Sequence, residues 1–133
     1  MILVDTSVWI EFFNGMDTAG VRMLEDLIER EEEVCISNYI LTEVLQGFRR
    51  DRDFELAQTH LLLFPVYSLK GMDSYVKAAQ IYRKCRKYGI TIRKTADCII
   101  AQTAIENKLL LLHNDSDFDK MAPVSGLKIY QRS

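Results

Sequence analysis

Five acidic side chains in this sequence stand where short apolar segments end or where the next helix is expected to begin. Asp5 directly follows an apolar run, Asp115 comes shortly after another, and Asp117 lies two positions further on. Asp97 falls in the first turn of an expected helix, and Glu43 lies about one and a half turns into another. In a parallel α/β sheet the carboxyl ends of the strands share one edge, so we expect these side chains to meet there.

Several carboxylates in one pocket favour a divalent cation. Like charges a few ångströms apart repel and raise one another's pKa. Mg²⁺ prefers oxygen ligands and keeps several waters, and Mn²⁺ is expected to substitute for it. A metal held by carboxylates lowers the pKa of a water molecule and stabilises charge on a phosphodiester. The acids therefore indicate metal-dependent phosphodiester hydrolysis.

Each acid also has a simpler structural interpretation. Asp5 and Asp115 are both placed to cap a following helix, and Asp97 suits the positive end of a helix dipole. Glu43 could be a solvated helix residue, although its neighbours in YILTEVLQGF are mostly apolar. Four such coincidences at one edge of one sheet are improbable together, which favours the metal site.

Other motifs with related chemistry are incomplete. The run that begins at Asp115 resembles the start of an EF-hand loop, but its sixth position is Lys120 and its twelfth is Gly126. A phosphatase of the D-x-D type needs an acid where Ser7 stands, and no Gly-rich phosphate loop is present. The two histidines are far apart, and the three cysteines form no C-x-x-C pair.

Strand-like and helix-like segments alternate along the chain, which predicts an α/β sandwich with a mainly parallel sheet. We expect one domain over residues 1–133. The expected strands are 2–4, 34–36, 65–67, 109–112 and 127–130. The expected helices are 7–13, 17–33 with a cap at Asp17 or Thr18, 38–47 with a cap at Ser37 or Asn38, 53–64, 74–88 and 95–107 with a cap at Thr95.

The charge balance does not by itself suggest a nucleic-acid partner, because the net charge is -2 and the pI about 5.7. The distribution matters more than the sum. Arg93 and Lys94 directly precede the helix of Asp97, and we predict that they hold substrate phosphates. No apolar run is long enough for a membrane span and no secretory signal is evident, so we expect a cytoplasmic protein with reduced cysteines.

Four segments of the chain resemble the PIN-domain ribonucleases, and within them the VapC toxins of prokaryotic toxin–antitoxin pairs. The matching strings are ILVDTSVWIEF, ILTEVLQGF, IRKTADCIIAQTAIEN and LLLLHNDSDFDKMAPVSGLKIY. They extend from the first expected strand to the last. The resemblance implies a PIN-like three-layer α/β/α sandwich with a five-stranded central sheet.

The resemblance also implies roles for individual residues. The acids that match its catalytic set are Asp5, Glu43, Asp97 and Asp115. The implied metal ligands are Asp5, Asp97, Asp115 and Asp117, with the order of proximity of the last two left open. Thr6 or Ser7 matches a hydroxyl that supports the site. Many members carry Thr where this chain has His113, and Asn114 or Ser116 could supply the missing polar group.

The function implied is that of a toxin: a Mg²⁺-dependent endoribonuclease, restrained by a VapB-type antitoxin, that forms homodimers and toxin–antitoxin hetero-oligomers. Two alternatives stay open from the residues. One is a PIN nuclease of RNA processing or DNA repair. The other is a PIN-fold binding module without catalysis, for which we would expect one or more of the four acids to be missing.

Overall fold

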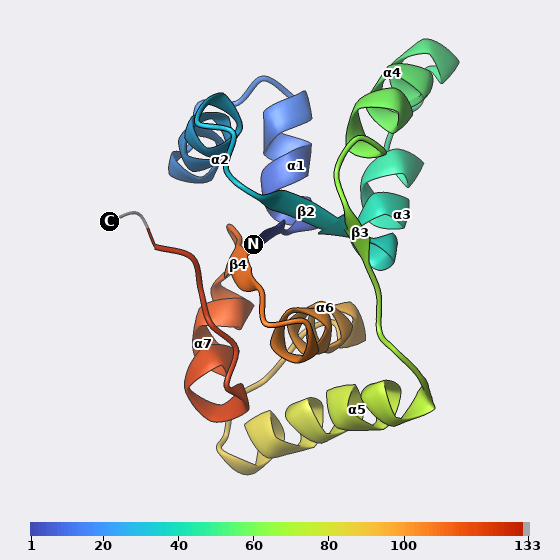
Figure 1. Cartoon of the computed structure of the whole chain (residues 1–133). Coiled ribbons are helices and arrows are strands. Elements are labelled where there is room, and N and C mark those ends of the chain that lie inside the picture. Colours follow the sequence, from blue (N-terminus) through green and yellow to red (C-terminus); the bar gives the residue numbers. More distant parts are fainter. Residues whose placement is uncertain (132–133) are drawn as a thin grey trace.

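A four-stranded parallel sheet forms the centre of the protein, in a computed structural model that describes residues 1–131 (Figure 1). The strand order is β3-β2-β1-β4, and every neighbouring pair is parallel. The strands are β1 (Ile2–Val4), β2 (Val34–Ser37), β3 (Val66–Tyr67) and β4 (Leu110–Leu112). Because all strands run the same way, their carboxyl ends meet at one edge, as the alternating pattern predicted.

The fifth strand expected at residues 127–130 is wrong as a full strand. The amide of Leu111 donates to the Lys128 carbonyl at 2.9 Å, and the amide of Tyr130 donates to the Leu111 carbonyl at 2.8 Å. These two bonds make one isolated parallel bridge between Leu111 and Ile129. The segment therefore lies beside β4 at the predicted edge, but it engages only one residue of a three-residue strand.

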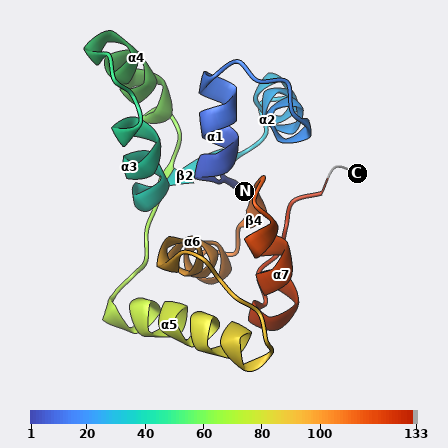
Figure 2. The same ribbon diagram turned by 180° about the vertical axis from the view of Figure 1, so that it is seen from behind.

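Two helical layers enclose the sheet and complete the predicted three-layer sandwich (Figures 1 and 2). The first layer contains α1 (Thr6–Phe13), α2 (Ala19–Glu29), α3 (Asn38–Gln46) and α4 (Asp51–Leu61). The second contains α5 (Met72–Lys87), α6 (Thr95–Glu106) and α7 (Ser116–Ser125), which pack on one another. None of the helices within residues 1–131 combines the length and the apolar composition that a bilayer crossing requires.

Side-chain caps account for two of the predicted helix starts. The Thr18 hydroxyl accepts from the amide of Val21 at 3.2 Å, and the Ser37 hydroxyl accepts from the amide of Ile40 at 3.1 Å. The cap expected at Thr95 is wrong. That helix starts at Thr95 itself, the cap position is Lys94, and no side-chain bond closes it.

The predicted end of the second helix near residue 33 is also wrong. The helix stops at Glu29 because Glu31 adopts a left-handed conformation with φ of 56°. The amide of Glu31 then donates to the Ile28 carbonyl, and the amide of Glu32 to the Leu27 carbonyl. This is a Schellman termination, in which a residue other than glycine occupies the left-handed position.

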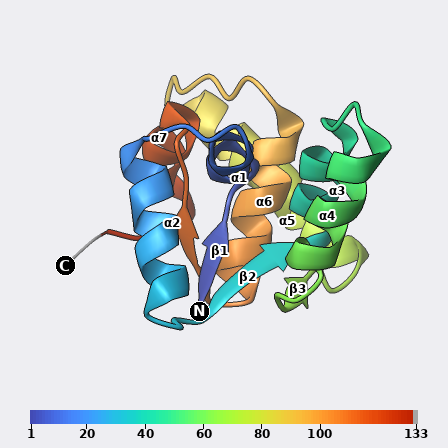
Figure 3. The ribbon, with the colours of Figure 1, turned by 90° about the horizontal axis from the view of Figure 1, so that it is seen from above.

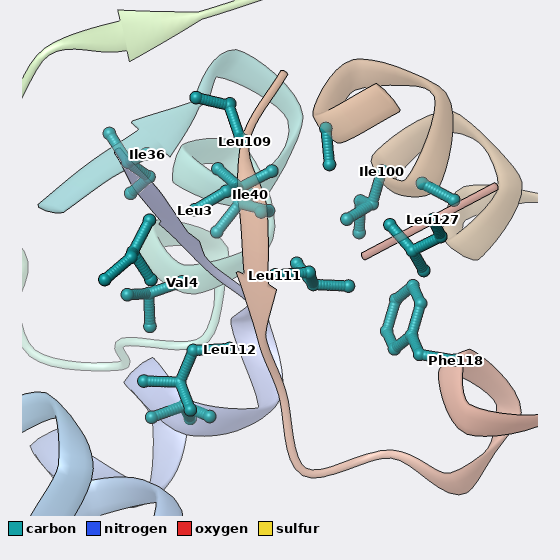
Figure 4. Close-up of a cluster of buried hydrophobic side chains, with 14 of the residues drawn as sticks. Leu3, Val4, Ile36, Ile40, Ile100, Leu109, Leu111, Leu112, Phe118 and Leu127 are labelled. Atoms are coloured by element: carbon teal, nitrogen blue, oxygen red, sulfur yellow. The ribbon is translucent and has the colours of Figure 1, made fainter. Parts of the chain in front are cut away.

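The core lies on both faces of the neighbouring strands β1 and β4 (Figure 4). Leu3 and Leu111 are completely buried, with Ile40 of α3 on one side and Phe118 of α7 on the other. Burial of each such side chain contributes about 1.5–3 kcal/mol. This packing fixes β1 and β4 side by side, and the loops that leave them carry the candidate site residues.

Candidate active site

Asp5 stands at the junction between the sheet and the first helix. Its amide donates to the Leu112 carbonyl at 2.9 Å, which joins the ends of β1 and β4. Its Oδ2 accepts from the Ser7 amide at 3.0 Å and from the Ser7 hydroxyl at 2.6 Å. Asp5 therefore caps α1. Burial raises the pKa of this carboxyl, although the bonds from Ser7 lower it in part.

The two hydroxyls considered as supports of the site, those of Thr6 and Ser7, donate to carboxylates. Thr6 Oγ1 donates to Glu43 Oε1 at 2.7 Å, which ties α1 to α3 and places Glu43 beside the Asp5 segment. Ser7 Oγ donates to Asp5 and accepts from the amide of Asn114 at 3.0 Å. Thr6 thus orients Glu43 from a distant segment, and Ser7 orients Asp5 while it ties α1 to the loop after β4.

Asp97 combines burial with an unsatisfied carboxylate oxygen. It lies in the first turn of α6 with 5% of its surface exposed, and its Oδ2 is buried without a hydrogen-bond partner. Burial and the negative charges of Asp115 and Asp5 raise its pKa to about 7. Asp97 is therefore close enough to Asp5 and Asp115 for their charges to oppose its ionisation. A buried carboxylate of this kind needs either a proton or a cation.

Arg93 binds the other two acids. Its Nη2 donates to Asp115 Oδ1 at 2.9 Å, and its Nε donates to Asp117 Oδ2 at 3.0 Å. Burial alone would raise the pKa of Asp117, but the hydrogen bonds and charge of Arg93 hold it below its ordinary value. Arg93 was predicted to hold substrate phosphates. In this structure its guanidinium is bound to Asp115 and Asp117, whereas Lys94 is exposed at the start of α6.

His113 organises the loop after β4, although from the sequence it stands out only because many related proteins carry Thr at this position. His113 Nδ1 accepts from the Asp115 amide at 3.0 Å, and its Nε2 lies 3.1 Å from Asp119 Oδ1. Its ring is almost buried against Phe118. Of the two proposed substitutes for a threonine, Asn114 makes the contacts, through its amide to Ser7 and its side chain to Glu11 at 2.7 Å.

A closed cage of protein ligands for a metal is absent from the described part of the chain. Within residues 1–131 no group of three or more Asp, Glu, His or Cys side chains lies close enough together to enclose an ion. The donors that are present are nevertheless hard carboxylate oxygens, and one of them is the partnerless Oδ2 of Asp97. This set fits an ion such as Mg²⁺, which binds through one or two carboxylates and retains several waters.

Comparison with known proteins places these residues in a family context. Residues 2–123 match the family model described as PIN domain. The chain is 32% identical over 129 residues to Ribonuclease VapC11 of Mycobacterium tuberculosis, covering 96% of each protein.

Solved structures show the same fold. VapBC2 from Rickettsia felis, bound to a DNA fragment from its promoter, superposes with a TM-score of 0.73 at 17% identity and covers 100% of both chains. The Mycobacterium tuberculosis toxin VapC20, which cleaves the sarcin–ricin loop, superposes with a TM-score of 0.69 at 20% identity. This superposition covers 90% of the present chain and 93% of the VapC20 chain.

Proposed function

The chain belongs to the PIN-domain family, and from this premise we propose that it is a toxin of the VapC type: a Mg²⁺-dependent endoribonuclease. We extend the single PIN domain to the whole of residues 1–133. The observation that carries the proposal is the environment of Asp97, whose buried oxygen has no partner and whose pKa is raised to about 7 by burial, Asp115 and Asp5. These surroundings would disfavour an ionised carboxylate that served only to start a helix. They suit a carboxylate that binds a cation.

Asp5 and Asp97 would hold the ion, with Asp115 and Asp117 beside it. A bound Mg²⁺ supplies Lewis-acid stabilisation of charge on the scissile phosphate and lowers the pKa of a coordinated water. The chain's own residues supply the geometry. Ser7 fixes one oxygen of Asp5, and Thr6 fixes one oxygen of Glu43, so that neither carboxylate rotates freely.

Arg93 and Asp97 give the site its charge balance. Arg93 neutralises Asp115 and Asp117, which leaves Asp97 and Asp5 as the acids with raised pKa values. Asp97 holds a proton near neutral pH while no cation compensates it, and it gives up that proton when positive charge arrives. Water, and not the ribose 2′-hydroxyl, is the nucleophile, so the products carry a 5′-phosphate and a 3′-hydroxyl.

The proposed partner is a VapB-type antitoxin, with which the chain, as a homodimer, forms a hetero-oligomer. An apolar cavity of about 310 Å³ between α1, α2 and α4 supports this proposal, since it is lined by aromatic side chains such as Trp9, Phe12 and Phe64. It suits an apolar segment of a partner. The three buried, unpaired cysteines agree with a cytoplasmic location.

The test is cleavage of a labelled RNA by the wild type with Mg²⁺, with Mn²⁺ and with EDTA, alongside Asp5→Asn and Asp97→Asn. Each substitution is expected to reduce cleavage by more than about 100-fold, because even residues that only orient metal ligands contribute 10- to 100-fold. Asp53→Asn, an exposed acid of α4, is the control and should cleave normally.

Cleavage that survives EDTA and both site substitutions would refute the metal mechanism. An absence of cleavage on every RNA, with no Mg²⁺ bound, would favour a non-catalytic binding module. The ends of the products separate water attack from 2′-hydroxyl attack, which leaves a cyclic or 3′-phosphate.

A further inference from the structure

Positive charge is concentrated in one part of a chain that is acidic overall. Residues 74–96 contain seven of the 17 Lys and Arg residues and none of the 19 Asp and Glu residues. The rest of the chain is therefore strongly acidic. Such an asymmetry steers a polyanion toward one side of the molecule, in spite of the net charge of -2.

The last turns of α5 present most of this charge to solvent. Arg83, Lys84, Arg86 and Lys87 are all exposed, and we call these four residues the basic patch. They line a cavity of about 640 Å³ together with Gln80 and Tyr88. No carboxylate within residues 1–131 lies at ion-pair distance from any of the four.

Aromatic rings accompany the positive charges. Tyr88 is 65% exposed at the rim of the cavity, and the guanidinium of Arg86 lies 5.8 Å from the ring centroid of Tyr82. Exposed rings beside cations are the usual platform on which unpaired bases stack while phosphates are held nearby. Helix-dipole stabilisation also favours positive charge at a helix C-terminus, but it requires neither a cavity nor an exposed tyrosine.

The chain connects the basic patch directly to the acids. Gly89, with φ of 76°, ends α5 in a Schellman turn in which the Ile90 amide donates to the Cys85 carbonyl. The following loop returns to the start of α6 and runs along the edge of the molecule where β1 ends (Figures 2 and 3). Lys87 and Arg93 are six positions apart in the sequence, so their Cα atoms lie at most about 22 Å apart.

We propose that the basic patch is a second RNA contact, which holds the sugar–phosphate backbone of the substrate away from the scissile phosphate. This inference rests on the proposed ribonuclease function and adds a docking surface to it. RNA that enters the acidic site meets Arg93 already bound to Asp115 and Asp117, so phosphate affinity has to come from elsewhere. The basic patch supplies positive charges with no competing carboxylate.

The experiment compares Lys84→Ala/Lys87→Ala with Arg49→Ala/Arg52→Ala, which removes the same charge from exposed residues just before α4 and in its first turn. Binding of a fluorescent stem-loop RNA is measured in EDTA, to prevent cleavage, between about 50 and 200 mM KCl. Each phosphate contact contributes roughly 5- to 8-fold at 0.1 M salt. The patch variant should therefore bind roughly 25- to 60-fold more weakly, with a salt slope smaller by about 1.4 to 1.8.

Tyr88→Leu gives an independent measurement, because it should weaken binding without changing the salt slope. In Mg²⁺ the patch variant should show a raised KM with an unchanged kcat, since the contact is equal in ground and transition states. Thermal unfolding in the same buffer shows whether the variants remain folded.

Three results would overturn the proposal: equal RNA affinity of the patch variant and the wild type, an equal loss in the arginine control, or no binding of RNA by the wild type in EDTA. A patch that serves an acidic protein would give the first of these. If the wild type still cleaves RNA when one of these results is found, only the RNA contact at the basic patch is refuted and the ribonuclease function stands. If the wild type neither cleaves nor binds RNA, both proposals are refuted.

Discussion

Replacing Asp97 with asparagine should stabilise the metal-free protein above neutral pH. The carboxylate is 5% exposed, its Oδ2 has no partner, and the nearby charges of Asp115 and Asp5 oppose its ionisation. Asparagine is nearly the same size and carries no charge. The variant therefore removes an unfavourable ionisation without leaving a cavity in the site.

The magnitude follows from the difference between the two states. The pKa of Asp97 is 3.8 in the unfolded chain and about 7 in the folded protein. One pKa unit corresponds to about 1.4 kcal/mol, so the full difference is about 4 kcal/mol, and residual solvent screening reduces the expected value to about 2–4 kcal/mol. Between these pH values the unfolded chain binds fewer protons than the folded one. Stability from this group is therefore present below pH 3.8 and is lost as the pH rises to about 7.

Urea unfolding in EDTA at about pH 4 and pH 8 measures this difference. The free energy of unfolding of the wild type should fall relative to Asp97→Asn between the two pH values. Asp117→Asn is the matched control with the opposite sign, because Arg93 lowers the pKa of Asp117 and its stabilisation appears above the ordinary carboxyl range. Parallel pH profiles for the wild type and Asp97→Asn, or a less stable Asp97→Asn at pH 8, would refute the reasoning.

Three further predictions concern single contacts. Lys108→Gly should raise the free energy of unfolding, measured in urea, by about 1 kcal/mol. Lys108 lies just after α6 with φ of 55°, a conformation that favours glycine. An unchanged urea midpoint would contradict this. Thr6→Val should lower the cleavage rate about 10- to 100-fold at unchanged thermal stability, since it removes the donor that orients Glu43; full activity would show that this bond is dispensable. Arg93→Ala should lower the melting temperature at pH 7 and much less at pH 3, where Asp117 is protonated in the variant; equal losses at both pH values would argue against the ion pair.

The elements that carry the site could be predicted from local sequence because their signals are local. The apolar runs at β1, β2 and β4 are bounded by polar residues, and parallel strands buried on both faces have this composition. Thr18 and Ser37 cap helices through bonds that span only three residues. The fifth strand was not predictable in this way, because the composition of residues 127–130 is the same whether they form a ladder or the single bridge at Ile129.

The partners of the site residues were harder to predict, because they come from distant segments. Arg93 reaches Asp115 and Asp117 across more than 20 positions, and neither the KTAD nor the NDSD string indicates that contact. The sequence around His113 indicates only a missing hydroxyl, whereas the ring accepts from the Asp115 amide and closes the loop. A histidine two residues before a helix cap is the only local sign of that role.

The capping and metal-binding interpretations of the acids are compatible, since a carboxylate has two oxygens with about four lone-pair sites. Both bonds from Ser7 end on Oδ2 of Asp5, and the bonds from Arg93 and the Asp117 amide both end on Oδ1 of Asp115. A cap therefore fixes each side chain through one oxygen and directs the other by covalent geometry. Asp97 has no such bond to Oδ2, which makes it the acid whose surroundings are explained least by helix stability and most by a cation.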